Sequence, residues 1–125
     1  MARVTGVGGI FVRAKGDRAA LLEWYRTHLG IEADPAWGGR VFPGQACGLT
    51  WSIFAPDTAY FGDPGNAFMV NYTVDDLDGL LNQLRTAGIE VSEGVEDNDY
   101  GRFGWCVDPE GRRIELWEPP PSDDP

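Results

Sequence analysis

The chain has 125 residues, 42% of them hydrophobic and 12% aromatic, which is enough for a single domain with its own core. Twenty acidic and ten basic residues give a formal net charge of −10, which argues against binding to nucleic-acid phosphates. No apolar run approaches the roughly 20 residues of a membrane-spanning helix, so no membrane partner is expected. The charge would suit a cationic small molecule, or it serves only to keep the protein in solution.

The two cysteines, Cys47 and Cys106, could form at most one disulfide. The first strand is predicted to begin within a few residues of Met1, which leaves no room for a signal peptide. We therefore expect both cysteines to be buried thiols of a cytoplasmic protein.

The chain repeats its own plan, because "RTHLGIE" at 26–32 is echoed by "RTAGIE" at 85–90. In each half an apolar stretch meets an aspartate, Asp17 or Asp75, and a helical pattern then runs to a glycine, Gly30 or Gly88. Short β-rich segments follow each helix. The strands predicted after the helices lie at about 31–35, 39–43 and 47–54 in the first half and at about 89–95, 101–107 and 112–118 in the second.

This pattern predicts an α+β fold in which two tandem βαβββ modules form one domain. The first module spans about 4–56 and the second about 67–120. The turn-rich stretch "DTAYFGDPGN" at 57–66 is expected to connect them.

The repeated motifs also suggest a family. "GD…WYRTHLGI" in the first half and "DDLD…LRTAGIEV…YGRFGWCVDPEGRRIELWEPP" in the second resemble the vicinal oxygen chelate superfamily, the glyoxalase, bleomycin-resistance and extradiol-dioxygenase group. The resemblance covers about residues 4–120, and "DPEGRRIELWEP" is its most specific piece. It implies a mixed sheet curled into a cup, and a homodimer with "AYFG" and "AFMV" near the partner subunit.

Alternation of apolar and polar side chains along the strands assigns one face to this cup. In "RRIELWE", Ile114 and Leu116 suit the helix side, which turns Glu115 and its alternate neighbours inward. Glu115 is the candidate catalytic residue. The candidate ligand-binding residues are Phe11, Arg13, Ser52, Phe54, Asn71, Phe103, Trp105 and Trp117.

Metal-dependent members of the superfamily hold a divalent ion with up to four ligands, and Glu115 matches the last of these positions. The other three fall among residues 8–11, on Ser52, and among residues 68–71, where only Asn71 offers an oxygen. One carboxylate and one amide do not make a zinc, iron or manganese site, so we expect no metal and no other cofactor. His28, the only histidine, is expected at a helix end on the far side of the sheet.

Two functional hypotheses remain, and a third is weaker. The favoured one is a metal-independent protein that binds an aromatic or cationic compound in an acidic, aromatic-lined cup. The alternative is a metal-independent isomerase, epimerase or lyase that uses Glu115 as general acid or base. A metal-dependent glyoxalase or dioxygenase is the third. The first two differ in whether Glu115 is free to meet a ligand or locked to Arg113 or Arg102.

Overall fold

The computed structural model describes residues 1–43 and 48–121 of the chain. The prediction for Cys47 lies outside the described residues. Cys106 is a buried free thiol, and burial raises its pKa, as expected for an unreactive cysteine.

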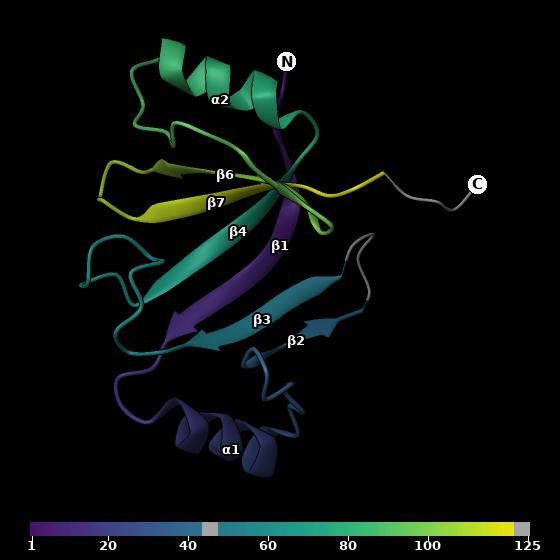
Figure 1. The fold of residues 1–125 in the computed structure, drawn as a ribbon, viewed down its shortest axis with the longest axis vertical. Helices are drawn as coiled ribbons and strands as arrows, with labels where there is room; N and C mark the ends of the chain where they lie inside the picture. Colours follow the sequence, from purple (N-terminus) through teal and green to yellow (C-terminus); the bar gives the residue numbers. More distant parts are fainter. Residues whose placement is uncertain (44–47, 122–125) are drawn as a thin grey trace.

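The described residues form two helices and seven strands, joined into one α+β domain (Figure 1). In chain order they are β1 (Val4–Arg13), α1 (Arg18–Leu29), β2 (Gly39–Phe42), β3 (Leu49–Phe54), β4 (Phe68–Val74), α2 (Leu77–Thr86), β5 (Glu96–Asn98), β6 (Gly101–Val107) and β7 (Arg113–Glu118). The predicted fold class is confirmed.

The sheet shows the internal repeat directly. Its strand order is β2-β3-β1-β4-β7-β6-β5, and the two halves meet where β1 pairs antiparallel with β4. Each half contains one matching parallel pair, β1 with β3 and β4 with β7. Figure 1 shows α1 and α2 at opposite ends of the curled sheet, which leaves the middle of the sheet to build a site.

Both helices begin at an aspartate, as predicted, but the second begins one residue later. The carboxylate of Asp17 accepts hydrogen bonds from the backbone N–H groups of Ala19 and Ala20. In α2 the cap is Asp76, because the carboxylate of Asp75 accepts instead from the backbone N–H of Arg3. Asp76 therefore caps α2, whereas Asp75 binds the backbone near the start of the chain.

Two predicted strands are wrong. The segments at 31–35 and 89–95 contribute only isolated bridges, Asp34 with Gly39 and Val91 with Cys106. In the second segment, backbone hydrogen bonds join Ser92 to Trp105 and Glu90 to Val107, and ladder pairing with β6 continues in β5. Each half consequently presents a shorter sheet edge than the tandem repeat predicts.

The core has two parts on opposite faces of the sheet. Beneath α2, the fully buried Leu77 and Leu81 pack against Val74, Leu116 and Cys106. The second part lies on the concave face of the sheet, where Phe11, Phe61 and Met69 are buried together with partly buried Phe54, Tyr60 and Trp105 at its margin. The second cluster includes two residues from the connecting stretch 57–66.

This linker, residues 57–66, folds back over the concave face rather than outward. Phe61 is 0% exposed, and its ring lies 5.0 Å from that of Phe54. Arg13 fastens the linker, because its guanidinium donates to the backbone carbonyls of Thr58 and Asn66 and lies 5.2 Å from the Phe61 ring centroid. Phe61 of "AYFG" is therefore buried within its own chain, and the placement of "AYFG" near a partner subunit stays a prediction.

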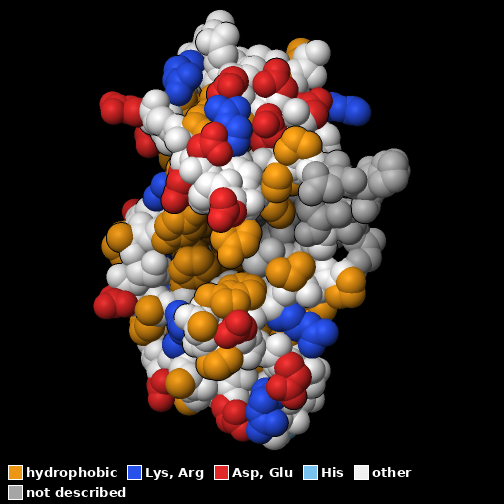
Figure 2. Space-filling view, turned by 45° about the vertical axis from the view of Figure 1, so that its right-hand side comes forward, with side chains coloured by type: hydrophobic (Ala, Val, Ile, Leu, Met, Phe, Trp, Pro, Cys, Tyr) orange, Lys and Arg blue, Asp and Glu red, His pale blue; other side chains and the backbone are white. Residues whose placement is uncertain are grey.

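The surface separates apolar from charged regions. Figure 2 shows hydrophobic side chains gathered across the middle of one face, with acidic and basic side chains toward its two ends. Within residues 1–43 and 48–121, no helix is long and apolar enough to cross a membrane.

Candidate functional site

A cavity of about 800 Å³ opens on the concave face of the sheet. We call this cavity the cup. Apolar and aromatic side chains dominate its wall, two carboxylates lie in it, and no lysine or arginine belongs to its described lining. The lining residues are Gly8, Phe11, Trp37, Val41, Thr50, Asn71, Asp99, Tyr100, Phe103, Glu115, Trp117, Pro119 and Pro120.

Several predicted site residues meet in the cup. Phe11, Asn71, Phe103, Glu115 and Trp117 line it together, although they come from four strands. The sheet register brings them there, because Asn71 pairs with Glu115, and Phe103 pairs with Trp117. The rings of Phe103 and Trp117 stack with centroids 5.9 Å apart and planes 3° from parallel. They form a flat apolar wall.

The other predicted ligand-binding residues lie elsewhere. Arg13 holds the linker, and Phe54 packs beneath it in the concave core cluster. The hydroxyl of Ser52 donates to the backbone carbonyl of Gly38, which ties it to the neighbouring loop. Trp105 lines a second pocket. All four were assigned to the cup from local sequence patterns, and the linker covers part of the face that these patterns selected.

Sequence reasoning also missed residues that matter here. Tyr60 comes from the linker, and its ring stacks on Phe54 with centroids 5.6 Å apart and lies 6.1 Å from Trp105. Trp37 and Asp99 reach the cup from loops. A loop carries no periodic signal, so nothing in the sequence pattern places these side chains.

Gly8 makes room for the polar centre of the cup. A Cβ atom at this position would collide with Oδ1 of Asn71 and would lie 2.8 Å from Cε3 of Trp117. The absence of a side chain on β1 thus allows Asn71 and Trp117 to occupy the middle of the site.

Glu115 is not locked to an arginine. Its side chain is only 4% exposed, and its Oε2 has no hydrogen-bond partner among the described residues. The two arginines that could have paired with it are engaged differently. Arg102 lies 2.9 Å from Asp78, and the guanidinium of Arg113 lies over the rings of Tyr60 and Trp105 at 5.5 and 5.1 Å.

This environment changes the acidity of Glu115. Burial raises its pKa from 4.5 to about 7, while the nearby Tyr60 hydroxyl, the Asn71 side chain and the charge of Arg113 partly oppose that rise. Burial and the charge of Glu115 in turn hold the pKa of Tyr60 well above its usual range. Near neutral pH, Glu115 is therefore divided between its acid and base forms, while Tyr60 remains a neutral hydroxyl.

A raised carboxyl pKa makes the folded state bind more protons than the unfolded chain between about pH 4.5 and about pH 7. Glu115 therefore opposes folding increasingly as the pH rises through this window, by about 3 kcal/mol at its upper end. We expect Glu115→Gln to be more stable than wild type near pH 8 by up to that amount and similar to it near pH 4.

Urea unfolding at the two pH values measures this difference. Asp99→Asn provides the control, because it removes a carboxylate from an exposed position at the rim of the same cup. If the difference in unfolding free energy between Glu115→Gln and wild type stayed constant with pH, the raised pKa of Glu115 would be wrong.

With the geometry established, comparison with known proteins identifies the family. Residues 9–116 match the family model described as the Glyoxalase/Bleomycin resistance protein/Dioxygenase superfamily. The chain belongs to this superfamily. The family that the motifs resembled is thereby confirmed, whereas no match was found among curated proteins.

Solved structures of this superfamily share the fold over nearly the whole chain. Methylmalonyl-CoA epimerase from Mycobacterium tuberculosis is 26% identical with a TM-score of 0.64, covering 94% of this chain and 90% of that one. A methylmalonyl-CoA epimerase in complex with methylmalonyl-CoA and NH4+ is 17% identical with a TM-score of 0.70, covering 98% and 100%. A superfamily member from Vibrio splendidus 12B01 is 13% identical with a TM-score of 0.60, covering 94% and 99%.

The residues of the present chain do not fit the divalent metal that the resemblance implies for metal-dependent members of the superfamily. At the expected ligand positions the structure presents Gly8 and Gly9, the hydrogen-bonded hydroxyl of Ser52, the amide of Asn71 and the carboxylate of Glu115. Within the described residues, no group of three or more His, Cys, Asp or Glu side chains could hold a metal ion. One carboxylate beside one amide falls short of the converging ligands that such sites require.

We therefore expect the purified protein to contain no stoichiometric zinc, iron or manganese and to keep its melting temperature in EDTA. Elemental analysis and thermal unfolding with and without chelator measure both. About one equivalent of any of these metals per chain, lost together with stability in EDTA, would contradict this expectation.

Proposed function

We propose that this protein is a metal-independent enzyme in which Glu115 transfers a proton to or from a small molecule bound in the cup. The proposal rests on the observation that no arginine or lysine among the described residues forms an ion pair with Glu115. This carboxylate lines the cup, is 4% exposed and has an oxygen without a partner among the described residues. A carboxylate that served only to neutralise an arginine would instead be paired with one.

The cup suggests the class of substrate. Its walls are aromatic, its described ionisable lining consists of Asp99, Tyr100 and Glu115, and the chain carries a net charge of −10. A neutral or cationic compound with a flat apolar part fits these walls and this charge. Methylmalonyl-CoA, which is bound in one of the similar structures, carries several phosphate charges that the acidic cup would repel.

The proposed chemistry follows from the pKa of Glu115, which lets this carboxyl group act as a base or as an acid near neutral pH. The ionised carboxylate of Glu115 takes a proton from a carbon next to a carbonyl group, and the electron pair of the broken C–H bond moves into an enolate. The side chain of Asn71, which lies beside Glu115, is placed to orient the oxygen of the substrate. Return of the proton to another atom gives isomerisation, and loss of a neighbouring group gives elimination. Protonation by Glu115 on the opposite face of the same carbon, after the enolate has turned over in the cup, gives epimerisation.

The comparisons support an enzyme rather than a passive binder. The similar structure with the highest identity reported above, at 26%, is an epimerase, and epimerisation is proton-transfer chemistry. Because this chain departs from the metal-ligand pattern, the proposal assigns the proton transfer to Glu115 alone and assigns no role to a metal.

An exchange experiment tests the proposal. Compounds that raise the melting temperature are selected from a panel of neutral and cationic aromatic carbonyl compounds, and each is then incubated with the protein in D₂O. We expect NMR to show loss of the C–H signal next to the carbonyl group. The rate should rise about tenfold per pH unit below about pH 7 and level off above it, because the ionised form of Glu115 is the base. An exchange rate whose pH dependence does not level off near neutral pH would contradict the role of Glu115.

A second candidate is the binding protein that composition favours. The stacked rings of Phe103 and Trp117 offer the flat wall that a sequestered aromatic compound needs. Thermal-shift hits that bind tightly in the cup and never exchange a proton would favour this candidate over the enzyme.

A homodimer in the cytoplasm completes the proposal for this protein. Superfamily resemblance and the exposed side chain of Phe68 at the edge of "AFMV" support the dimer. Sedimentation that shows only monomer at micromolar concentration would contradict it.

A further inference from the structure

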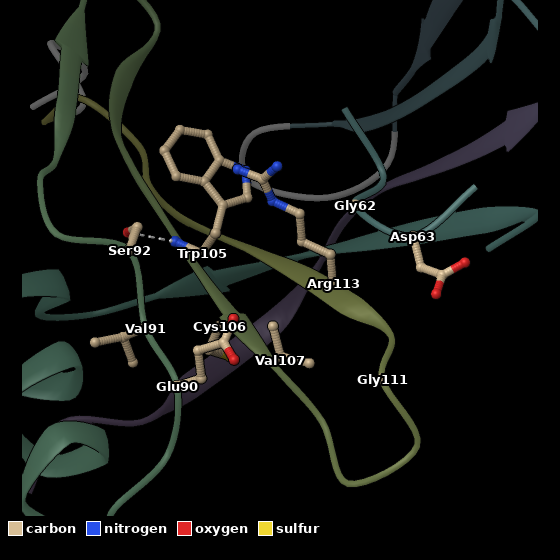
Figure 3. Close-up of a pocket in the computed structure, with 10 residues that line it drawn as sticks. All are labelled: Gly62, Asp63, Glu90, Val91, Ser92, Trp105, Cys106, Val107, Gly111 and Arg113. Carbon is tan, nitrogen blue, oxygen red and sulfur yellow. Dashed lines mark hydrogen bonds between the residues drawn. The ribbon is translucent and has the colours of Figure 1, made fainter. Parts of the chain in front are cut away.

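A second, smaller pocket of about 340 Å³ lies between the linker and the hairpin of β6 and β7 (Figure 3). It shares no lining residue with the cup, so it is a separate site. Its lining residues are Gly62, Asp63, Glu90, Val91, Ser92, Trp105, Cys106, Val107, Gly111 and Arg113.

Arg113 is the unusual member of this lining. Its guanidinium lies 5.5 Å from the Tyr60 ring centroid and 5.1 Å from that of Trp105, and Figure 3 shows it beside the indole of Trp105. Among the described residues it forms no ion pair within 4 Å and no hydrogen bond. Arg113 is also partly buried, so its contact with water is reduced.

The neighbouring Arg112 shows what an arginine ordinarily does in this hairpin. Its Nη1 atom lies 2.8 Å from Oε1 of Glu110 and 3.5 Å from Oδ2 of Asp108, and its side chain is 45% exposed. Arg112 is therefore already neutralised at the surface. Arg113 has carboxylates lining the same pocket, Asp63 and Glu90, yet pairs with neither.

Contact with two rings satisfies the faces of a guanidinium but not its N–H groups, which point outward in its plane. The rings also restrict the motion of the side chain, so little conformational entropy remains to be lost when a ligand binds. A planar fork of donors held in this way matches the two oxygens of a carboxylate. Val91, Val107 and Trp105 supply apolar walls for the rest of such a ligand.

We propose that this pocket binds the carboxylate group of a small organic acid, with Arg113 as its anchor. A monoanion is favoured over a phosphate, because Asp63 and Glu90 line the same pocket and a doubly charged group would be repelled more strongly. The proposal does not depend on the role of Glu115, since Glu115 belongs to the lining of the cup and not to that of this pocket.

The test follows the Nε–H signal of Arg113 by ¹H–¹⁵N NMR while benzoate, acetate or inorganic phosphate is added at constant ionic strength. We expect saturable shifts with benzoate, weaker binding of acetate because it cannot contact the apolar walls, and the weakest response with phosphate. Arg113→Gln should reduce benzoate affinity at least about tenfold, the effect of losing a charge-assisted pair of hydrogen bonds. Arg112→Gln is the matched control and should leave benzoate affinity unchanged.

Two further variants keep the result interpretable. Arg113→Lys retains the charge but not the fork, and we expect it to weaken benzoate binding as well, which separates loss of the fork from loss of the charge. Far-UV circular dichroism checks that each variant is folded. Glu115→Gln should keep saturable benzoate binding, with affinity equal to or higher than that of wild type because a negative charge that acts on Arg113 is removed. Failure of proton transfer at Glu115 and failure of this site are therefore distinguishable. No saturable shift of Arg113, or equal losses in Arg112→Gln and Arg113→Gln, would overturn the proposal.

Discussion

Glu115→Gln should slow proton exchange into a bound carbonyl compound by about 10²-fold to 10⁴-fold, the usual contribution of a positioned general base. Glutamine has nearly the same shape but cannot accept the proton. The fold should survive, because Glu115 forms no ion pair with the described residues and β7 is held by backbone pairing with β4 and β6. Activity and stability should therefore change in opposite directions.

The measurement is exchange in D₂O at about pH 8, with far-UV circular dichroism to confirm the fold. Asp99→Asn is again the matched control, since it lines the same cup and removes the same charge. Its exchange rate at a saturating concentration of the compound should stay near that of wild type. Binding of a cationic compound should weaken in both variants, because each removes negative charge from the cup. Unchanged exchange in Glu115→Gln would show that the cup acts without this carboxylate.

The second large effect concerns the linker. Phe61→Ala should lower the free energy of unfolding by about 3–5 kcal/mol, the typical cost of truncating a buried phenylalanine. Phe61 is 0% exposed and packs with Phe11 and Met69, and its ring also lies under the guanidinium of Arg13. Truncation leaves a cavity that the rigid sheet beneath the linker cannot close.

Urea unfolding measures this loss, and Leu29→Ala is the control for truncation of an exposed apolar side chain. Leu29 is 60% exposed, so its replacement should cost less than about 1 kcal/mol. We further expect the pKa of Glu115 in Phe61→Ala to fall from about 7 toward 4.5, because a loosened linker admits water to the carboxylate. Equal losses in the two variants would mean that the linker does not anchor the concave face.

Local patterns in the sequence determined most of the framework. The alternation in "FMVNYTV" and "RRIELWE" predicted strands at β4 and β7 and turned Asn71 and Glu115 to the same face, because side chains alternate along any strand whatever its partners. The cap at Asp17 and the left-handed Gly30, with φ of 69°, are likewise decided within a few residues. The same motifs indicated the superfamily, which the match over residues 9–116 confirmed.

Prediction from local sequence failed at two places. One is the start of α2, where two neighbouring aspartates could each be the N-cap, and the other is the predicted strand at 89–95. It expected Asp75 to begin α2 as its N-cap or a first-turn residue, whereas the carboxylate of Asp75 accepts a hydrogen bond from the backbone N–H of Arg3, 72 residues away in the chain. It expected a strand at 89–95, where only the bridge of Val91 remains. Each outcome depends on partners brought from elsewhere by folding.

Only the tertiary structure decided what the polar residues of the concave face can do. Folding of the linker buried Phe61 and placed the ring of Tyr60 against those of Phe54 and Trp105. It also engaged the guanidinium of Arg13 in a hydrogen bond to the backbone carbonyl of Thr58. Glu115 then remains unpaired because aromatic rings, and not its carboxylate, hold Arg113. A sequence shows which residue carries a charge, but the energy of that charge depends on the neighbours and the water around it, and these are known only after the chain has folded.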